Sequence, residues 1–308
     1  MWPNFGVKFE AGWMSVVRHG DRIDLAHVIR PLGRRPEIKV CESFRIESTE
    51  AGALARLAQA RGLKHHRCAA LLGEADYRMV QVDAPAVPPE ERAQALRWHL
   101  KDVVDFPVDS AAIAVADIPT EGGRQAGVFA IVAPAAVVSE RMALFHDKKI
   151  PLEAIDIPEM AIRNVAVLFE EANRGLAFLA LTQGDGLLTI TCRGELYLSR
   201  RIEIATDALA QADDERRRQM LERLALELQR TLDNFDRQYG FISVSRLLVA
   251  SEFDCAGTVA ALAENLYLPV QAADLASVAD FAGLPELRSA ERQAQSLLAI
   301  GAALRSET

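Results

Sequence analysis

Apolar and polar positions alternate in two separate stretches of this chain, and each stretch predicts a set of strands. Residues 7–28 alternate through two apolar runs that are separated by a Gly20-Asp21 turn, which predicts two or three antiparallel strands. Residues 175–199 follow the same plan, with a strand after Gly175, a turn, a second strand to Cys192, an Arg193-Gly194 turn and a third strand. The chain is therefore predicted to contain one design twice.

A helix is predicted after each set of strands. Ser48-Thr49-Glu50 can cap a helix over 51–61 that stops at Gly62. A longer helix is predicted over 213–239, with acids in its first turn and Gly240 at its end. Its apolar residues recur every three or four positions: Leu221, Leu224, Leu228, Leu232, Phe235 and Tyr239. This spacing fits a core-facing helix or a coiled-coil seam, and the lack of regular charge pairing beside it favours the core-facing helix.

The remaining segments alternate between strand and helix patterns. A middle module is predicted to contain a strand over 71–82, a helix over 88–104, strands over 113–118 and 127–133, and a helix over 134–148. After Gly240 we expect a strand over 244–250, a helix over 257–266, a short strand at Val270 and a last helix over 288–305. This alternation predicts an α/β fold with parallel pairing in its sheets.

Composition indicates an ordinary globular protein of about two domains. The chain has 308 residues, of which 50% are hydrophobic and 25% are charged. Its four cysteines lie far apart within or beside apolar stretches, which predicts buried reduced thiols: Cys41, Cys68, Cys192 and Cys255. A net charge of −8 argues against general affinity for nucleic acid or anionic lipid.

Neither an export signal nor a membrane-spanning segment is expected from the residues of this sequence. Residues 1–4 carry neither a basic nor an apolar leader, so we expect a cytoplasmic protein. The longest apolar run, over 126–138, is broken by Pro134 and is shorter than the roughly 20 residues that a spanning helix needs.

No arrangement of residues typical of a catalytic or metal site is present in the sequence. Phosphate-loop, nucleophile-elbow and zinc-protease motifs are missing. His65 and His66 are adjacent and should point in different directions, which makes them a poor metal pair, and no metal site is expected. Asp102 and Asp105 are expected to be solvated rather than catalytic.

One aromatic residue departs from the pattern of the helix predicted over 88–104. Leu96 and Leu100 fall on its apolar face, whereas Trp98 points nearly opposite, beside Lys101 and Asp102. A tryptophan in this position either covers a neighbouring subdomain or contacts a partner. Trp98, together with Trp13, is therefore a candidate partner-binding residue.

The middle of the chain resembles a known family. The stretches ALRWHLKDVVDFP (95–107) and IDIPEMAIRN (155–164) are its most specific parts, and ELQRTLDNFDRQYG and AQSLLAIGAALR agree further along. They resemble the MSHA pilus biogenesis proteins of the MshI type, which are relatives of the type IV pilus assembly protein PilM. The resemblance covers nearly the whole chain.

This resemblance implies the actin-like ATPase fold related to FtsA, with two ribonuclease-H-like halves and an inserted α/β subdomain. The expected domains are 1–70 for the first part of the first half, 71–150 for the inserted PilM-like 1C subdomain, 151–174 for the return to the first half, and 175–308 for the second half. PilM-type proteins bind ATP in the cleft.

The nucleotide-binding positions that the resemblance implies are altered in this sequence. The family's Asp-x-Gly in the first hairpin falls on Lys8 and Glu10, and in the second hairpin on Ala180 and Thr182. A carboxylate is needed there for magnesium and a glycine for close approach of phosphate. The adenosine turn carries Glu252 and Phe253, which would crowd a nucleotide. The cleft is therefore expected to be degenerate and to hold no cofactor.

The Gly184-Asp185-Gly186 triplet is displaced from the position that would grip phosphate. Glycine and aspartate readily adopt the positive φ of a hairpin turn, which favours a turn over a ligand loop.

The resemblance implies a non-catalytic cytoplasmic scaffold in MSHA or type IV pilus assembly, peripheral to the inner membrane. Its expected partner is a bitopic PilN-like protein, whose cytoplasmic tail would lie in a groove between the first half and the inserted subdomain. The pilus assembly ATPase is a further expected partner. The alternative is an ATP-binding or weakly ATP-hydrolysing protein that uses ATP and magnesium, with Glu10 and Asp185 in place of the missing carboxylates.

Overall fold

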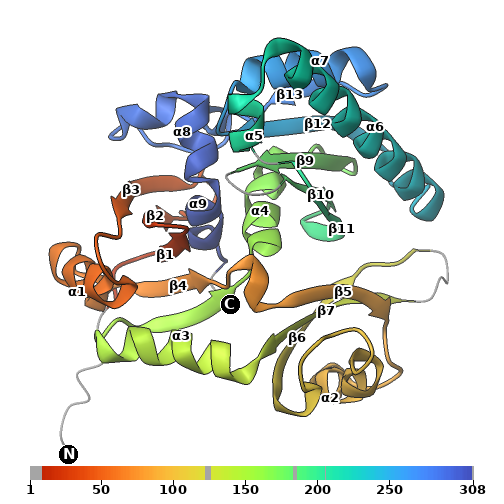
Figure 1. Cartoon of the computed structure of the whole chain (residues 1–308). Helices are drawn as coiled ribbons and strands as arrows, with labels where there is room; N and C mark the ends of the chain where they lie inside the picture. Colours follow the sequence, from red (N-terminus) through yellow and green to blue (C-terminus); the bar gives the residue numbers. More distant parts are fainter. Residues whose placement is uncertain (1–8, 122–125, 183–185, 205, 307–308) are drawn as a thin grey trace, which may run out of the picture. The chain divides into compact units, whose positions relative to one another are not determined.

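The computed structural model describes residues 9–121, 126–182, 186–204 and 206–306 (Figure 1). The chain divides into two compact units, one of residues 1–23 and 44–158 and the other of residues 24–43 and 159–308. Three sheets organise it: two of five strands and one of three.

The first five-stranded sheet has the strand order β3-β2-β1-β4-β8. Its strands are β1 (Trp13–His19), β2 (Arg22–Ile29), β3 (Glu37–Arg45), β4 (Arg67–Leu71) and β8 (Leu152–Asp156). β4 pairs in parallel with both β1 and β8. The predicted turn between the first two strands is present at Gly20, which has the positive φ that glycine adopts without strain.

The second five-stranded sheet has the order β11-β10-β9-β12-β13. Its strands are β9 (Gly175–Leu181), β10 (Gly186–Cys192), β11 (Glu195–Ile202), β12 (Val244–Ser251) and β13 (Val270–Ala272). β10 is antiparallel to both β9 and β11, while β12 is parallel to β9 and β13. Three consecutive strands followed by two parallel ones appear in the same order in both sheets, which confirms the prediction of one design used twice.

The three-stranded sheet interrupts the first copy of this design. β12 is followed by one helix and then β13, whereas β4 is followed by β5 (Arg78–Asp83), β6 (Ala111–Ile118) and β7 (Gly127–Pro134) before the chain reaches β8. These three strands form an antiparallel sheet in the order β5-β7-β6. An inserted α/β module is thus present, and the residue bounds expected for the domains stay a prediction.

The strand predicted over 71–82 is wrong, because two strands occupy that stretch. β4 ends at Leu71, and a short 3-10 helix, η2 (Glu74–Asp76), separates it from β5. The Asp76 carboxylate accepts a hydrogen bond of 2.9 Å from the Gly73 N–H and closes this turn. The chain can therefore leave one sheet and enter another within a few residues.

Helix α2 (Pro89–Leu100) packs on one face of the three-stranded sheet. Leu96 and Leu100 are buried against Val128, Ala130 and Val132 of β7. The helix ends at Leu100 rather than at residue 104 as predicted, and Val103 and Val104 instead lie in a turn whose N–H groups donate to the Leu100 carbonyl.

The other helices of the first unit are α1 (Glu50–Ala60) and α3 (Ala135–Asp147). Thr49 caps α1, because its side chain accepts from the Gly52 N–H, and Gly62 follows the helix with a φ of 60°. The predicted start and stop of this helix are confirmed. The 3-10 helices η1 (Leu63–His65) and η3 (Val108–Ser110) complete the unit.

The second unit carries most of the helical residues. Its helices are α4 (Pro158–Ala166), α5 (Thr206–Gln211), α6 (Asp214–Gln238), α7 (Cys255–Asn265), α8 (Ala290–Gln295) and α9 (Leu297–Ala303), with the 3-10 helices η4 (Val167–Phe169), η5 (Leu275–Ser277) and η6 (Pro285–Arg288). Asp213 caps α6, and the apolar stripe of this helix is buried, so the core-facing prediction is confirmed over a coiled-coil seam.

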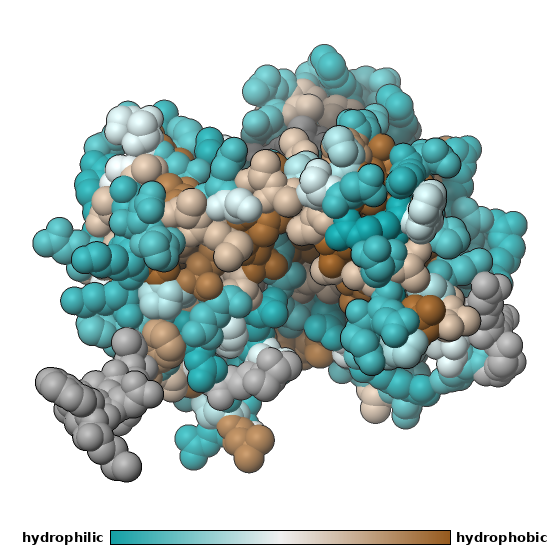
Figure 2. Space-filling view, turned by 90° about the horizontal axis from the view of Figure 1, so that it is seen from below, coloured by the Kyte–Doolittle hydropathy of each residue, from teal (hydrophilic) through white to brown (hydrophobic). Residues whose placement is uncertain are grey.

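The single last helix predicted over 288–305 is instead two helices, since the chain adopts a non-helical ψ of 0° at Ser296 between α8 and α9. No helix among the described residues combines the length and the apolar character that crossing a membrane requires. Figure 2 shows that hydrophilic residues cover much of one face, with smaller groups of apolar residues among them.

Candidate functional site

The second hairpin has no polar group at the position where the resemblance places a magnesium-binding carboxylate. Ala180 lies in β9 between Leu187 of β10 and Ala250 of β12 and is 1% exposed. A residue inside the sheet and closed to solvent cannot present a charged group to a ligand without breaking the packing around it. Lys8, Gly184 and Asp185 lie outside the described residues.

The backbone of Thr182 is fixed by a hydrogen bond within the second unit. It directly follows β9, and its carbonyl oxygen accepts a hydrogen bond of 3.0 Å from the Thr206 hydroxyl at the start of α5. A phosphate-binding hairpin requires a backbone that a ligand can approach closely, and here the start of a helix is tied to that backbone.

The turn after β12 uses its own carboxylate to fill a possible anion site. Asp254 has a φ of 38° and caps α7, where its side chain accepts a hydrogen bond of 3.0 Å from the Gly257 N–H. The free N–H groups at a helix N-terminus favour phosphate, so an acid bonded there occupies and repels that ligand. A Cβ at position 257 would collide with the Asp254 carboxylate, so a side chain there would displace this cap.

Glu252 and Phe253 form the body of this turn. The Glu252 N–H donates to the Leu181 carbonyl at 3.1 Å, and the Phe253 N–H donates to the Ser251 hydroxyl at 3.2 Å. The Arg217 guanidinium lies 5.4 Å from the centre of the Phe253 ring, within the range of a cation–π contact.

Arg217 also donates to the carbonyl oxygens of Leu209 at 3.1 Å and Ala212 at 2.8 Å. The Arg217 side chain therefore links α5, α6 and the turn after β12.

The first hairpin is described only from Phe9 onward, so Glu10 is its one candidate position that can be placed. Glu10 is exposed, its N–H donates to the His65 carbonyl at 2.8 Å, and its carboxylate lies 4.0 Å from His66 Nε2. His65 is exposed and His66 is buried, which confirms that the two rings point in different directions.

The two tryptophans differ sharply in exposure. Trp13 begins β1 and is 8% exposed, so it offers little surface to a partner. Trp98 lies on α2 and is 75% exposed, with the Lys101 ammonium 4.3 Å from the centre of its ring. This exposure leaves the Trp98 ring available to a partner, and a partner contact through Trp98 stays a prediction.

The face of the three-stranded sheet opposite α2 carries a group of small and apolar residues that are open to solvent in part, and sequence reasoning missed it. Met79 of β5 pairs with Ile131 of β7, which pairs with Ala114 of β6, and this row lies on the face opposite α2. Ala114 is exposed, and Met79 and Ile131 are partly exposed. The available signal was the alternation Ala112, Ala114, Ala116, which places small residues on one face of a strand. We call Met79, Ala112, Ala114, Ala116 and Ile131 the small-sheet face.

All four cysteines are buried free thiols, as predicted. Burial raises the pKa of the Cys68 thiol to about 12 and also raises the pKa of Cys41 and of Cys255. Thiols with a raised pKa are poor nucleophiles and metal ligands at neutral pH.

No family model matches the chain, and no curated protein matches it. Among solved structures, the chain is similar to a PilM-PilN type IV pilus biogenesis complex, at 17% identity with a TM-score of 0.69, over 96% of this chain and 98% of that chain. It is also similar to a Bacteroides thetaiotaomicron protein with an actin-like ATPase fold and unknown function, at 11% identity with a TM-score of 0.51, over 94% of this chain and 99% of that chain. The protein therefore has the actin-like ATPase fold, which confirms the fold expected from the sequence.

Proposed function

We propose that this protein is a non-catalytic scaffold of type IV pilus assembly, of the MSHA type, which docks on the cytoplasmic tail of a PilN-like inner-membrane protein. The observation that carries the proposal is the likeness to the PilM-PilN complex over nearly the whole chain. Such docking would keep the protein cytoplasmic and peripheral to the inner membrane, within reach of the pilus assembly ATPase.

The chemistry of the second unit supports a scaffold over an ATPase. A buried alanine stands where a magnesium carboxylate would be needed, and Asp254 occupies the N-terminus of α7. Phosphoryl transfer depends on groups that position magnesium and neutralise phosphate, and neither group is supplied at these positions. The fold then serves to present surfaces rather than to bind a nucleotide.

The small-sheet face is the surface that we propose for the partner's tail. Its alanines let an extended peptide approach the sheet closely, while Met79 and Ile131 offer apolar contact at its centre. β5 and β6 are the outer strands of this sheet, so a peptide can also form main-chain hydrogen bonds along an outer strand. Main-chain hydrogen bonds would supply affinity and the apolar row would set the register.

Calorimetric titration with the amino-terminal cytoplasmic peptide of the PilN-like protein tests this docking. Ala114→Asp places a charge on the small-sheet face and should weaken peptide binding at least about tenfold, which corresponds to about 1.4 kcal/mol. Ala86→Asp makes the same change at an exposed position between β5 and α2 and should leave binding unchanged. If the unaltered protein does not bind the peptide, the scaffold proposal is wrong.

A parallel titration with ATP and magnesium tests the alternative function. We expect no binding at micromolar ATP. Binding in that range that Asp185→Ala abolishes would instead establish a nucleotide site built from nonstandard residues and would overturn the proposal of a non-catalytic cleft.

A further inference from the structure

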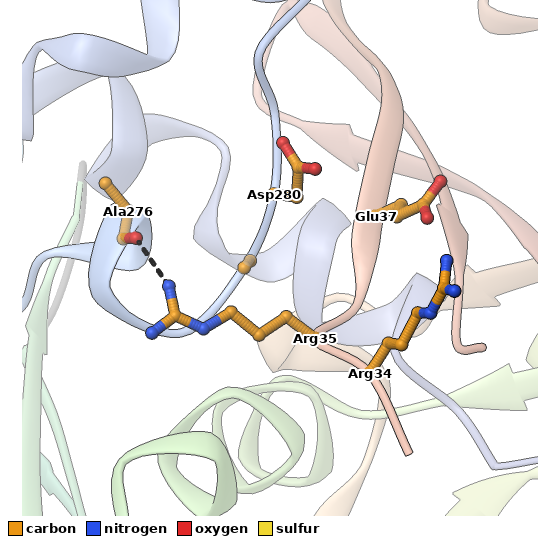
Figure 3. Close-up of a pocket in the computed structure, with 6 residues that line it drawn as sticks. Arg34, Arg35, Glu37, Ala276 and Asp280 are labelled. Carbon is orange, nitrogen blue, oxygen red and sulfur yellow. Dashed lines mark hydrogen bonds between the residues drawn. The ribbon is translucent and has the colours of Figure 1, made fainter. Parts of the chain in front are cut away.

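A pocket of about 490 Å³ lies in the second unit, between the loop that precedes β3 and the segment that follows η5. Figure 3 shows its charged lining: Arg34, Arg35, Glu37 and Asp280, with Ala276 and Ala279 completing it. A pocket of this size can accept a small ligand or a protein side chain. It belongs to neither the nucleotide positions nor the small-sheet face.

The backbone around this pocket is firmly held. The Asp280 N–H donates to the Pro36 carbonyl at 2.8 Å, and the Ile38 N–H donates to the Asp280 carbonyl at 2.8 Å. These bonds form an isolated parallel bridge between Glu37 and Asp280. The pocket walls are therefore fixed relative to each other before anything binds.

The side chains of the two arginines form few hydrogen bonds that a binding partner would have to replace. The Arg35 guanidinium reaches the Ala276 carbonyl at 3.5 Å, the outer limit of a hydrogen bond (Figure 3). Among the residues that the structure describes, the exposed side chain of Arg34 has no hydrogen-bonding partner. Both guanidinium groups can donate hydrogen bonds to a carboxylate with little loss of existing contacts.

The two acids of the pocket, Glu37 and Asp280, form few interactions within the chain. Glu37 forms an ion pair with Lys39, and one oxygen of the Asp280 carboxylate accepts from the Ala282 N–H at 3.1 Å. A carboxylate can accept several hydrogen bonds, so both acids can still form an ion pair with a guanidinium. The pocket thus offers two bases and two acids side by side.

Leu32 stands at the tip of the same loop and is 102% exposed, the most exposed of the large apolar side chains among the described residues. The loop is stiff, with Pro31 and Pro36 on either side and Gly33 at a φ of 69°. The Arg34 N–H donates to the Pro31 carbonyl at 3.2 Å and closes the turn. A rigid loop that presents an apolar side chain loses little entropy on binding.

We propose that this surface joins two copies of the chain about a twofold axis. Such a contact requires one patch to be complementary to itself, and this patch combines a protruding leucine with an adjacent pocket, and two arginines with two acids. Leu32 of each copy would pack against Ala276 and Ala279 at the pocket of the other, while Arg34 and Arg35 meet Glu37 and Asp280 across the axis. This dimer is independent of the proposed docking to the pilus partner.

Sedimentation equilibrium of the full chain, up to about 100 µM, tests the dimer, because interfaces of standard size reach micromolar affinity or better. Leu32→Ser removes two apolar contacts per dimer and should weaken association roughly 100-fold. Leu226→Ser alters another exposed leucine, on α6, and should leave association unchanged. A full chain that stays monomeric over this range overturns the proposal, and so does a Leu32→Ser protein that dimerises normally.

A pair of charge variants distinguishes this twofold contact from any other association. Arg34→Glu/Arg35→Glu and Glu37→Lys each place like charges across the axis, so neither protein should dimerise by itself. Mixed together, they should form a heterodimer, because each variant then faces opposite charges on its neighbour. Dimers of either variant alone, or the lack of a heterodimer from two folded variants, would show that the copies do not meet through this patch.

Discussion

Gly301 allows two helices of the second unit to approach each other more closely than any side chain permits. It lies in α9, and a Cβ placed on it would lie 2.1 Å from the carbonyl oxygen and 2.6 Å from the carbonyl carbon of Ala161 in α4. Asn164 of α4 also donates to the Gly301 carbonyl at 3.0 Å. We predict that Gly301→Ala destabilises the second unit.

The magnitude follows from two opposing terms. Replacing glycine by alanine inside a helix stabilises it by roughly 0.5–1 kcal/mol, because the unfolded chain loses freedom. Against this, added volume in a packed core costs about 1–3 kcal/mol. The clash here is with backbone, which cannot rotate away as a side chain can, so the upper end of that range applies. The expected net loss is about 2 kcal/mol.

Urea unfolding followed by far-UV circular dichroism measures this loss, and thermal unfolding should show a decrease in Tm of about 4–8 °C. Gly283→Ala is the matched control, since a Cβ at Gly283 meets nothing within 4 Å and its φ lies outside the left-handed region. The control should be neutral or slightly stabilising. A Gly301→Ala protein as stable as the control would show that the two helices do not pack this closely.

Three further outcomes follow from buried and exposed positions. Ala180→Asp should fail to restore ATP binding and should lower the stability of the second unit by about 3 kcal/mol or more in urea unfolding, because it buries an unpaired charge; a stable variant that binds magnesium ATP would contradict this. The Cys68 thiol should resist alkylation in the native protein at pH 8. Since its pKa is raised to about 12 in the folded state, its contribution to stability is present below about pH 8.5 and is lost as the pH rises towards 12, which a pH series of unfolding curves would reveal. Trp98→Ala should change the unfolding free energy by less than about 0.5 kcal/mol, and a larger loss would place Trp98 in a packed contact.

The sequence predicted correctly the helix ends that are marked by a capping residue or a glycine. Thr49 and Gly62 mark the two ends of α1, and Asp213 marks the start of α6, because capping depends on side chains within a few residues. The break of the predicted 71–82 strand and the break at Ser296 were missed. Both depend on how the chain changes direction between packed elements, which the apolar pattern of a short stretch does not record.

The candidate site shows the same division. The expectation that Ala180, Thr182, Glu252 and Phe253 stand at altered nucleotide-binding positions came from the family resemblance of the sequence and stays a prediction. That Asp254 caps α7, and that Arg217 stacks on Phe253, depend on a turn conformation and on contact between distant segments. The small-sheet face also required the strand pairing, because one strand by itself does not show which of its faces a helix covers.

The sequence by itself determined the alternation of strands and helices, the duplicated design and the buried character of the cysteines, because these follow from short-range periodicity and composition. Tertiary structure alone decided which residues share a surface. Arg34 and Glu37 are far from Asp280 in the sequence, and the three residues meet around one pocket because the segment after η5 pairs with the start of β3. Surfaces that bind partners are assembled from such long-range contacts, and their chemistry becomes visible only when the chain is folded.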